Sequence, residues 1–328
     1  MSDDGAILMR KVTPFKQQGF TLLELMVALA LGLIVSAAAI QLVLGSFITT
    51  KLQDANSQIQ DGGLFGLNYI VKDIQLLNYG NGNKYEITKS TDNGGLVLDN
   101  ANIVATTVNG ISIANLISQT NGPSNMTGIA SDQLTIQFIA PTQMSNCEGV
   151  NVRAGDLIVQ RYFLRNDTTH LSLVCDANTP TPIKVTETIT NADGTETSAE
   201  VNNPPQNRPT NLNGLGSDAQ VIIPRVDQFK ILIGGMNSAG QLAYYDINTF
   251  KSKVGLRVVA LKLSVLVRAE SVVSSQNIDQ TKAFNLFGIE NLTGLSGTLA
   301  NQTVANRIPR QVYIATIAIR NGLGKSDD

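Results

Sequence analysis

The sequence predicts an α+β fold in which a long N-terminal helix packs on a large antiparallel β domain. No charged residue occurs from Leu25 to Thr50, a run long enough for a bilayer core, which needs about 20 helical residues. Apolar residues then recur at spacings of three, four and seven as far as Leu77, the pattern of an amphipathic helix. Beyond residue 220, short apolar runs predict the strongest strands, and in residues 255–269 one face is apolar while the other is partly polar.

The helix is expected to occupy residues 20–78, with a membrane-spanning half at about 20–50 and an amphipathic half that packs on the domain. No proline occurs between Phe20 and Leu77, so a proline kink is excluded. The turn residues of the segment 78–83 end the helix. Residues 79–328 would then form the β-rich domain.

The residues around the start of the apolar run form a distinctive motif. Arg10, Lys11 and Lys16 precede Gly19-Phe20, and a single acid, Glu24, follows inside apolar sequence. A secretory signal has its cleavage site after the apolar region. Here the Gly-Phe junction comes before that region, so cleavage at the junction leaves the hydrophobic segment on the mature protein.

This motif resembles the class III signal of type IV prepilins and type II secretion pseudopilins. The resemblance implies that residues 1–19 are a leader, that prepilin peptidase cuts between Gly19 and Phe20, and that the new amino group of Phe20 is N-methylated. It also implies that Glu24 attracts the N-terminal amine of a neighbouring subunit during assembly, since a carboxylate in apolar sequence is costly unless paired. A plain single-pass anchor with an accidental glutamate is the alternative.

Two further points concern the leader and the helix. Asp3 and Asp4 dilute the leader's positive charge, and translation from Met9 instead of Met1 would give a purely basic leader. Basic residues before the span favour a cytoplasmic N-terminus and a periplasmic domain. Glycines interrupt the helix, and we interpret them as sites of close packing or a mild bend, or alternatively as a segment that unwinds during filament packing: Gly32, Gly45, Gly62, Gly63 and Gly66.

Short apolar runs predict the strands of the β domain. The expected strands are 95–98, 102–108, 111–117, 134–138, 221–223, 229–233, 255–269 and 312–319, with a loop at 121–126. Residues 134–138 alternate as a half-buried strand, whereas 312–319 is apolar on both faces and predicts a central strand. Residues 157–164 and 171–174 predict a hairpin turned at 165–168. The polar stretch 190–218 predicts a mobile loop or a boundary between two lobes.

The two cysteines, Cys147 and Cys175, bracket this hairpin region. In an oxidising compartment we expect them to form a disulfide that ties the loop before the hairpin to its second strand. The alternative is a reactive pair, although the CxxC spacing typical of such pairs is absent.

Little in the sequence favours an enzyme. His170 is the only histidine, and as a lone residue it fits a surface position better than a ligand position. Residues 191–196 resemble a calcium loop only faintly and lack its full ligand spacing. We therefore predict no catalytic residues, no metal and no cofactor. The net charge of −2 gives no indication of direct nucleic-acid binding.

A second resemblance covers the C-terminal strands. Residues 258–268 and 310–321 are similar to the C-terminal half of PilW-type minor pilins, while residues 80–220 cannot be aligned. The resemblance implies a pilin-like fold and a minor type IV pilin that helps prime pilus assembly in a tip or initiation complex, supporting twitching, adhesion or DNA uptake. Implied partners are other minor pilins, the major pilin, the inner-membrane platform protein, prepilin peptidase and a tip adhesin.

The implied location is the inner membrane, with a periplasmic domain, before assembly and the pilus tip or cell surface afterwards. Two alternatives stay open at this point. One is a J-type minor pseudopilin of type II secretion, which shares the anchor and a large β-rich domain. The other is a membrane-anchored module that binds a surface or a sugar.

Overall fold

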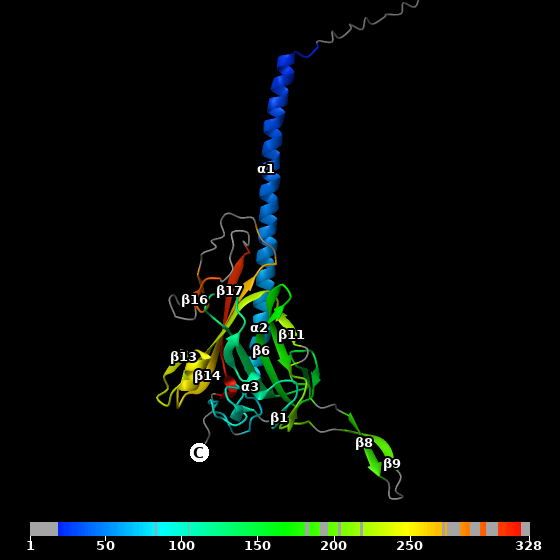
Figure 1. Ribbon diagram of the computed structural model, residues 1–328, viewed down its shortest axis with the longest axis vertical. Helices are drawn as coiled ribbons and strands as arrows, with labels where there is room; N and C mark the ends of the chain where they lie inside the picture. The colour runs from blue at the N-terminus through cyan, green and yellow to red at the C-terminus, as the bar shows by residue number, and fades with distance from the viewer. Residues whose placement is uncertain are drawn as a thin grey trace, which may run out of the picture. The chain divides into compact units, whose positions relative to one another are not determined.

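The computed structural model describes residues 19–82, 84–103, 105–180, 184–190, 196–202, 205–216, 219–270, 273, 283–288, 296–299 and 308–322 (Figure 1). The chain divides into two compact units, Met1–Lys51 and Leu52–Asp328. The leader residues discussed above, both candidate start positions and residues 191–195 of the calcium-like stretch lie outside the described residues.

The predicted N-terminal helix is present and runs from Leu22 to Leu76. It consists of α1 (Leu22–Gln60), a five-residue π-helical turn η1 (Asp61–Phe65) and α2 (Gly66–Leu76). In the first unit, the side chains of the helix are exposed on every face. This part contains a stretch that is long and apolar enough to cross a membrane.

The glycines near the π-helical turn allow the helix to approach the β domain closely. A Cβ atom on Gly63 would lie 2.3 Å from the ring of Tyr313, and one on Gly66 would lie 2.3 Å from the side chain of Ile223. These contacts support the interpretation of Gly63 and Gly66 as sites of close packing. The π turn itself is a local widening of the helix.

We predict that Gly66→Ala lowers the free energy of unfolding of the protein. Alanine improves helix propensity by up to ~1 kcal/mol, but overpacking a close contact costs about 1–3 kcal/mol. Gly62→Ala is the matched control, because the nearest atom to a Cβ at Gly62 is 3.8 Å away. Chemical denaturation of both variants checks this, and equal stability for the two would contradict close packing at Gly66.

Two antiparallel sheets form most of the β domain, so the predicted α+β fold class is confirmed. The five-stranded sheet has the order β11-β7-β6-β3-β2 and the four-stranded sheet the order β13-β12-β14-β17. The first contains β2 (Gln119–Gly122), β3 (Ser131–Ile139), β6 (Leu157–Asp167), β7 (His170–Ala177) and β11 (Gln220–Ile223). The second contains β12 (Val226–Met236), β13 (Leu242–Tyr245), β14 (Arg257–Arg268) and β17 (Arg310–Ala318).

Smaller elements complete the described part of the fold. They are the strand pairs β1 (Thr107–Val108) with β10 (Asn211–Leu212), β4 (Met144–Ser145) with β5 (Asn151–Val152), β8 (Lys184–Thr190) with β9 (Glu196–Asn202), and β15 (Phe284–Asn285) with β16 (Ser296–Gly297). The remaining helical turns are η2 (Asn100–Asn102), α3 (Ile113–Leu116), α4 (Ile247–Ser252) and η3 (Arg320–Gly322).

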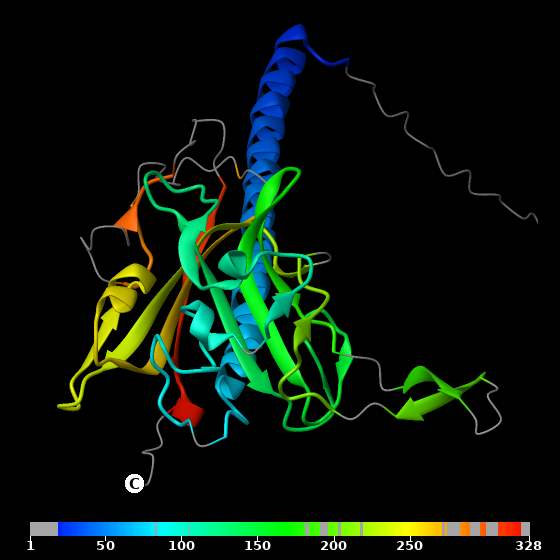
Figure 2. The ribbon, with the colours of Figure 1, turned by 60° about the horizontal axis from the view of Figure 1, so that its bottom comes forward.

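One face of the amphipathic part of the helix packs against both sheets. In both ribbon views the yellow-to-red strands of the four-stranded sheet and the green strands of the five-stranded sheet lie on opposite sides of α2 (Figures 1 and 2). Its buried residues, among them Leu67, Ile70 and Ile74, join one hydrophobic core with residues from both sheets. Burying such a side chain contributes about 1.5–3 kcal/mol, so this face holds the helix on the domain.

A buried ion pair joins the two sheets. At the start of β3, the Asp132 carboxylate accepts a hydrogen bond from Lys230 Nζ of β12 at 2.6 Å, and both side chains are almost completely buried. Asp132 also accepts from the backbone N–H of Ile231 at 2.8 Å. β12 pairs with β13 only from Ile233 onward. The Asp132 carboxylate therefore accepts the hydrogen bond from the Ile231 N–H that a residue of β13 would accept if the pairing extended that far.

Several strand predictions are wrong in detail. Residues 95–98 make a single bridge to β3 through Leu96, and of the run 102–108 only Thr107–Val108 is a strand. Residues 111–117 contain the helical turn α3, because the Ser112 side chain accepts a hydrogen bond from the N–H of Asn115 and caps it. The expected loop at 121–126 begins with the end of β2.

Two burial predictions also need correction. β3 is buried on both faces, because the chain segment before it covers Thr135 and Gln137. In contrast, β17 is not a central strand in the described part of the chain but the outer strand of its sheet, and Ile314 is 43% exposed. The stretch 190–218, expected to be a mobile loop or a boundary between two lobes, contains β9 and β10 in its described part.

Candidate functional site

The predicted cleavage site lies at the exposed start of the helix. Gly19 and Phe20 precede α1 in non-helical backbone, and the Phe20 side chain is 89% exposed. Glu24 lies in the first turn of α1. The structure therefore places the cleavage junction and the carboxylate within one helical turn of each other.

Glu24 is also part of a capping box with Thr21. The Glu24 Oε2 atom accepts hydrogen bonds from the backbone N–H and the hydroxyl of Thr21, both at 3.0 Å, and the Glu24 N–H donates to the Thr21 hydroxyl at 3.2 Å. This reciprocal arrangement satisfies helix N-terminal donors. Thr21 is not among the site residues predicted from the sequence, although threonine followed three positions later by glutamate is the known signature of this cap.

The cap leaves half of the carboxylate available. Oε2 accepts both hydrogen bonds from Thr21, while Oε1 accepts none from the described residues. A carboxylate in the first turn also interacts favourably with the positive end of the helix dipole. The geometry thus holds an ionised acceptor at the start of an otherwise apolar helix.

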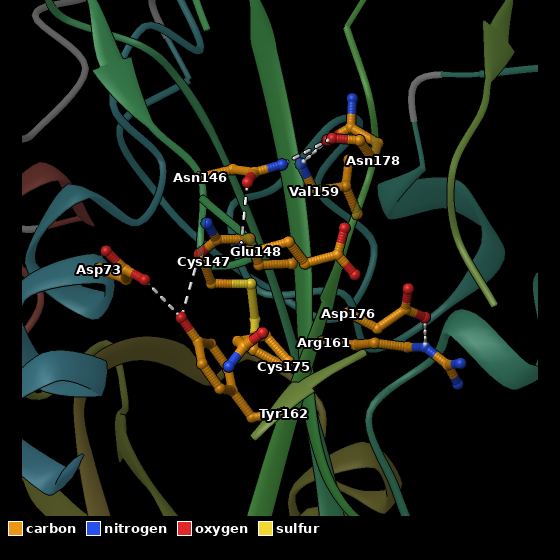
Figure 3. Close-up of a disulfide and its surroundings, with 12 residues drawn as sticks. Asp73, Asn146, Cys147, Glu148, Val159, Arg161, Tyr162, Cys175, Asp176 and Asn178 are labelled. Carbon is orange, nitrogen blue, oxygen red and sulfur yellow. Dashed lines mark hydrogen bonds and ion pairs between the residues drawn. A yellow bond between two sulfur atoms is a disulfide. The ribbon is translucent and has the colours of Figure 1, made fainter. Parts of the chain in front are cut away.

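A second cluster connects the helix to the disulfide (Figure 3). Cys147 and Cys175, the pair expected from the sequence, are joined by a disulfide with a Cα–Cα distance of 6.1 Å. Tyr162 of β6 is the cross-strand partner of Cys175, and its hydroxyl donates a hydrogen bond to Asp73 of α2 at 2.5 Å. The cluster fixes the sheet residue next to the disulfide to the buried face of the helix.

Asp73 is a buried carboxyl group whose pKa is raised. Its burial raises the pKa of the carboxyl group to about 6, although the hydrogen bond from Tyr162 and the charge of Lys72 both act to lower it. Burial also raises the pKa of Tyr162 well above its usual value, so this tyrosine remains a neutral donor. Ionised Asp73 is therefore tolerated in the folded protein at a free-energy cost.

That cost predicts a pH dependence of stability. A pKa of about 6 in the folded state and a normal aspartate pKa in the unfolded state mean that the folded protein binds more protons between about pH 4 and 6. The contribution of Asp73 to stability is therefore fully present below about pH 4 and is lost as the pH rises through 6. The total is on the order of 2–3 kcal/mol.

We expect Asp73→Asn to raise the unfolding free energy at pH 7.5 and to weaken its dependence on pH between 4 and 6, since the asparagine carbonyl still accepts from Tyr162 while carrying no charge. Denaturant unfolding over this pH range measures both effects. Asp54→Asn, an exposed position on the same helix, is the control. A pH profile unchanged from the wild type in the Asp73 variant would show that this carboxyl group titrates normally.

For the disulfide, we predict that the Cys147→Ser/Cys175→Ser double variant loses stability. The two cysteines are 28 residues apart, and the entropic model gives about 3–4 kcal/mol for a closure of this length. Thermal melting with and without a reducing agent is the measurement. The wild type should melt lower when reduced, whereas the variant should show no response; a wild type that is insensitive to reduction would contradict the prediction.

His170 is the remaining candidate residue that lies in the described part of the chain. His170 is half-buried at the start of β7, and its Nδ1 atom lies 2.9 Å from the Thr169 hydroxyl. Among the described residues, no three histidine, cysteine, aspartate or glutamate side chains are placed to hold a metal ion.

Comparison with known proteins identifies one feature. Residues 14–40 match the family model of the prokaryotic N-terminal methylation motif. The chain has a prepilin-type N-terminus. This motif contains Gly19, Phe20 and Glu24, and it covers only a small part of the chain.

The solved structures include a type IV-like pilin from Thermus thermophilus that is 13% identical, with a TM-score of 0.34, over 80% of this chain and 95% of the other. A TM-score of 0.34 is too low to show that the two proteins share a fold. A search of the curated proteins gives no significant match. The prepilin-type motif and the geometry described above are therefore the features of this chain that bear on its function.

Proposed function

We propose that this chain is a minor type IV pilin of the PilW kind, which helps to prime pilus assembly as part of a tip or initiation complex. The observation that carries the proposal is the methylation motif at residues 14–40 with Glu24 held in the first turn of a long apolar helix. Such a subunit acts by physical assembly and performs no catalysis. The two clusters described above, a helix cap and a disulfide beside a buried hydrogen bond, agree with a structural role.

The proposed mechanism starts in the membrane. The span at about 20–50 stores the subunit in the inner membrane, with the domain in the periplasm. Prepilin peptidase removes residues 1–19 and methylates the amino group of Phe20, which then carries a positive charge. That amine of one subunit pairs with Glu24 of its neighbour, and the free Oε1 atom allows this without breaking the Thr21 cap. Pairing compensates both charges in an apolar environment.

The large second unit favours a minor role over that of a shaft subunit. Residues 52–328 form one compact unit, and a domain of this size is difficult to accommodate on every subunit of a densely packed shaft. Other minor pilins, the major pilin, the platform protein and a tip adhesin are the proposed partners, and the pilus tip is the proposed final location. Twitching, adhesion or DNA uptake would depend on the assembled pilus.

We predict that Glu24→Ala inserts into the membrane and is cleaved normally but is depleted at least ~10-fold from sheared pili, because leaving one member of a buried charge pair alone costs several kcal/mol. Quantitative immunoblotting of membrane and sheared fractions measures this, and intact mass reports cleavage and methylation. Asp54→Ala, beyond the span on the same helix, is the control. Wild-type amounts of the Glu24 variant in sheared pili would reject the assembly role.

The J-type pseudopilin alternative requires a separate experiment. Deleting the gene and measuring sheared pili and type II secreted protein in the same culture distinguishes the two systems. Loss of pili with intact secretion supports the minor pilin, whereas failed secretion with normal pili supports the pseudopilin. An intact Gly19–Phe20 bond in cells with active prepilin peptidase would contradict both.

A further inference from the structure

The second unit contains a polar pocket that none of the assembly chemistry uses. Its volume is about 170 Å³, and it lies where the chain leaves the C-terminal end of α2. The turn Tyr79–Gly82, the β3 residues Gln137–Ile139 and the pair Asn207–Arg208 contribute to its wall. The turn belongs to the cyan segment that follows the helix at the lower end of Figure 2.

The shape of the pocket depends on a glycine in the turn. Gly80 has a φ of +77°, which favours glycine strongly, and a Cβ atom there would lie 2.5 Å from the side chain of Ile139. The turn therefore lies directly against β3. Because of this close approach, the turn that contains Tyr79 and the strand β3 form neighbouring parts of the pocket wall.

A buried acceptor in the wall lacks a partner. Gln137 is 2% exposed, and its Nε2 atom donates to the backbone carbonyls of Gly94, at 2.8 Å, and Asn102. Its Oε1 atom is buried and accepts no hydrogen bond from the described residues. A buried polar atom without a partner is rare and costly. This atom has almost no accessible surface, so Gln137 shapes the wall of the pocket and does not itself contact a bound molecule.

The rim of the pocket also contains polar side chains that have no partner among the described residues. Among the described residues, the side chains of Tyr79, Asn93, Asn207 and Arg208 form no hydrogen bond with one another or with other groups. The nearby carboxylate of Asp92 pairs with Lys84 at 2.9 Å, and among the described residues Arg208 forms no ion pair. The guanidinium group is thus available to a ligand.

These groups match the chemistry of a sugar that carries a carboxylate. Amide side chains donate and accept at once, as sugar hydroxyl groups do, and the half-exposed ring of Tyr79 offers an apolar surface for the face of a sugar ring. A guanidinium group binds a carboxylate in a bidentate geometry, through two parallel hydrogen bonds. A phosphate-rich ligand would favour more cations than the single Arg208, and an extended peptide would favour a longer groove.

We propose that this pocket binds one acidic sugar residue of the uronic acid type. The pocket holds the equivalent of roughly five or six waters, which suits a single ring. Arg208 binds the carboxylate, and the amide side chains of Asn93 and Asn207 form hydrogen bonds with the ring hydroxyl groups. The proposal does not depend on pilus assembly, because every residue involved lies in the second unit.

The test titrates the full-length protein in detergent micelles with D-glucuronate, D-glucose, acetate and inorganic phosphate, using saturation-transfer NMR. For a monosaccharide, a typical binding free energy of about −0.3 kcal/mol per non-hydrogen atom gives a dissociation constant on the order of 1 mM. We expect glucuronate to bind at least ~5-fold more tightly than glucose, with acetate and phosphate weaker than both.

Variants separate the contributions of single side chains. Arg208→Gln should reduce glucuronate binding to the level of glucose and leave glucose binding unchanged, whereas Lys253→Gln, an exposed cation elsewhere, should alter neither. Tyr79→Ala should weaken both sugars. No sugar binding up to about 20 mM, roughly twenty times the expected constant, would overturn the proposal, as would acetate or phosphate binding as tightly as glucuronate.

Discussion

The packing of the amphipathic helix against both sheets is the constraint on which the second unit depends. Gly63 and Gly66 have no Cβ atom, and this lets the helix backbone lie close to Tyr313 of one sheet and Ile223 of the other. Leu67, Ile70 and Ile74 then share one core with residues from both sheets. Without this helix face, two sheets that meet along β3 and β12 would expose their common core.

Polar contacts add positional specificity to this apolar packing. The Asp132–Lys230 pair fixes where β3 meets β12, and the Tyr162–Asp73 hydrogen bond fixes one turn of the helix over the disulfide-linked hairpin. Buried charges of this kind contribute little net stability, but an incorrect alignment would leave them unpaired. They therefore favour one arrangement of helix and sheets over neighbouring ones, at the cost that ionised Asp73 imposes near neutral pH.

The N-terminal motif and the pocket occupy different units and involve different chemistry. At the helix start, a single carboxylate caps its own helix through one oxygen, and the other oxygen is the one that the proposed pairing with a neighbour's amine would use. At the end of α2, neutral amides and one arginine surround a small cavity. A subunit with both features would combine assembly through its helix with recognition through its domain.

The sequence by itself determined the features that depend on local composition. The uncharged run, the motif around Gly19 and Glu24, the 157–174 hairpin and the long strands β12 and β14 are all readable from periodicity or spacing, because their signals lie within a few neighbouring residues. The structure decided what depends on distant segments. The burial of Gln137 and Thr135, the outer position of β17 and the partners of Asp73 and Asp132 arise from residues tens to hundreds of positions away. No local pattern records which distant segment will cover a strand, so only the tertiary structure could show that polar residues on β3 lie inside and apolar Ile314 on β17 lies outside.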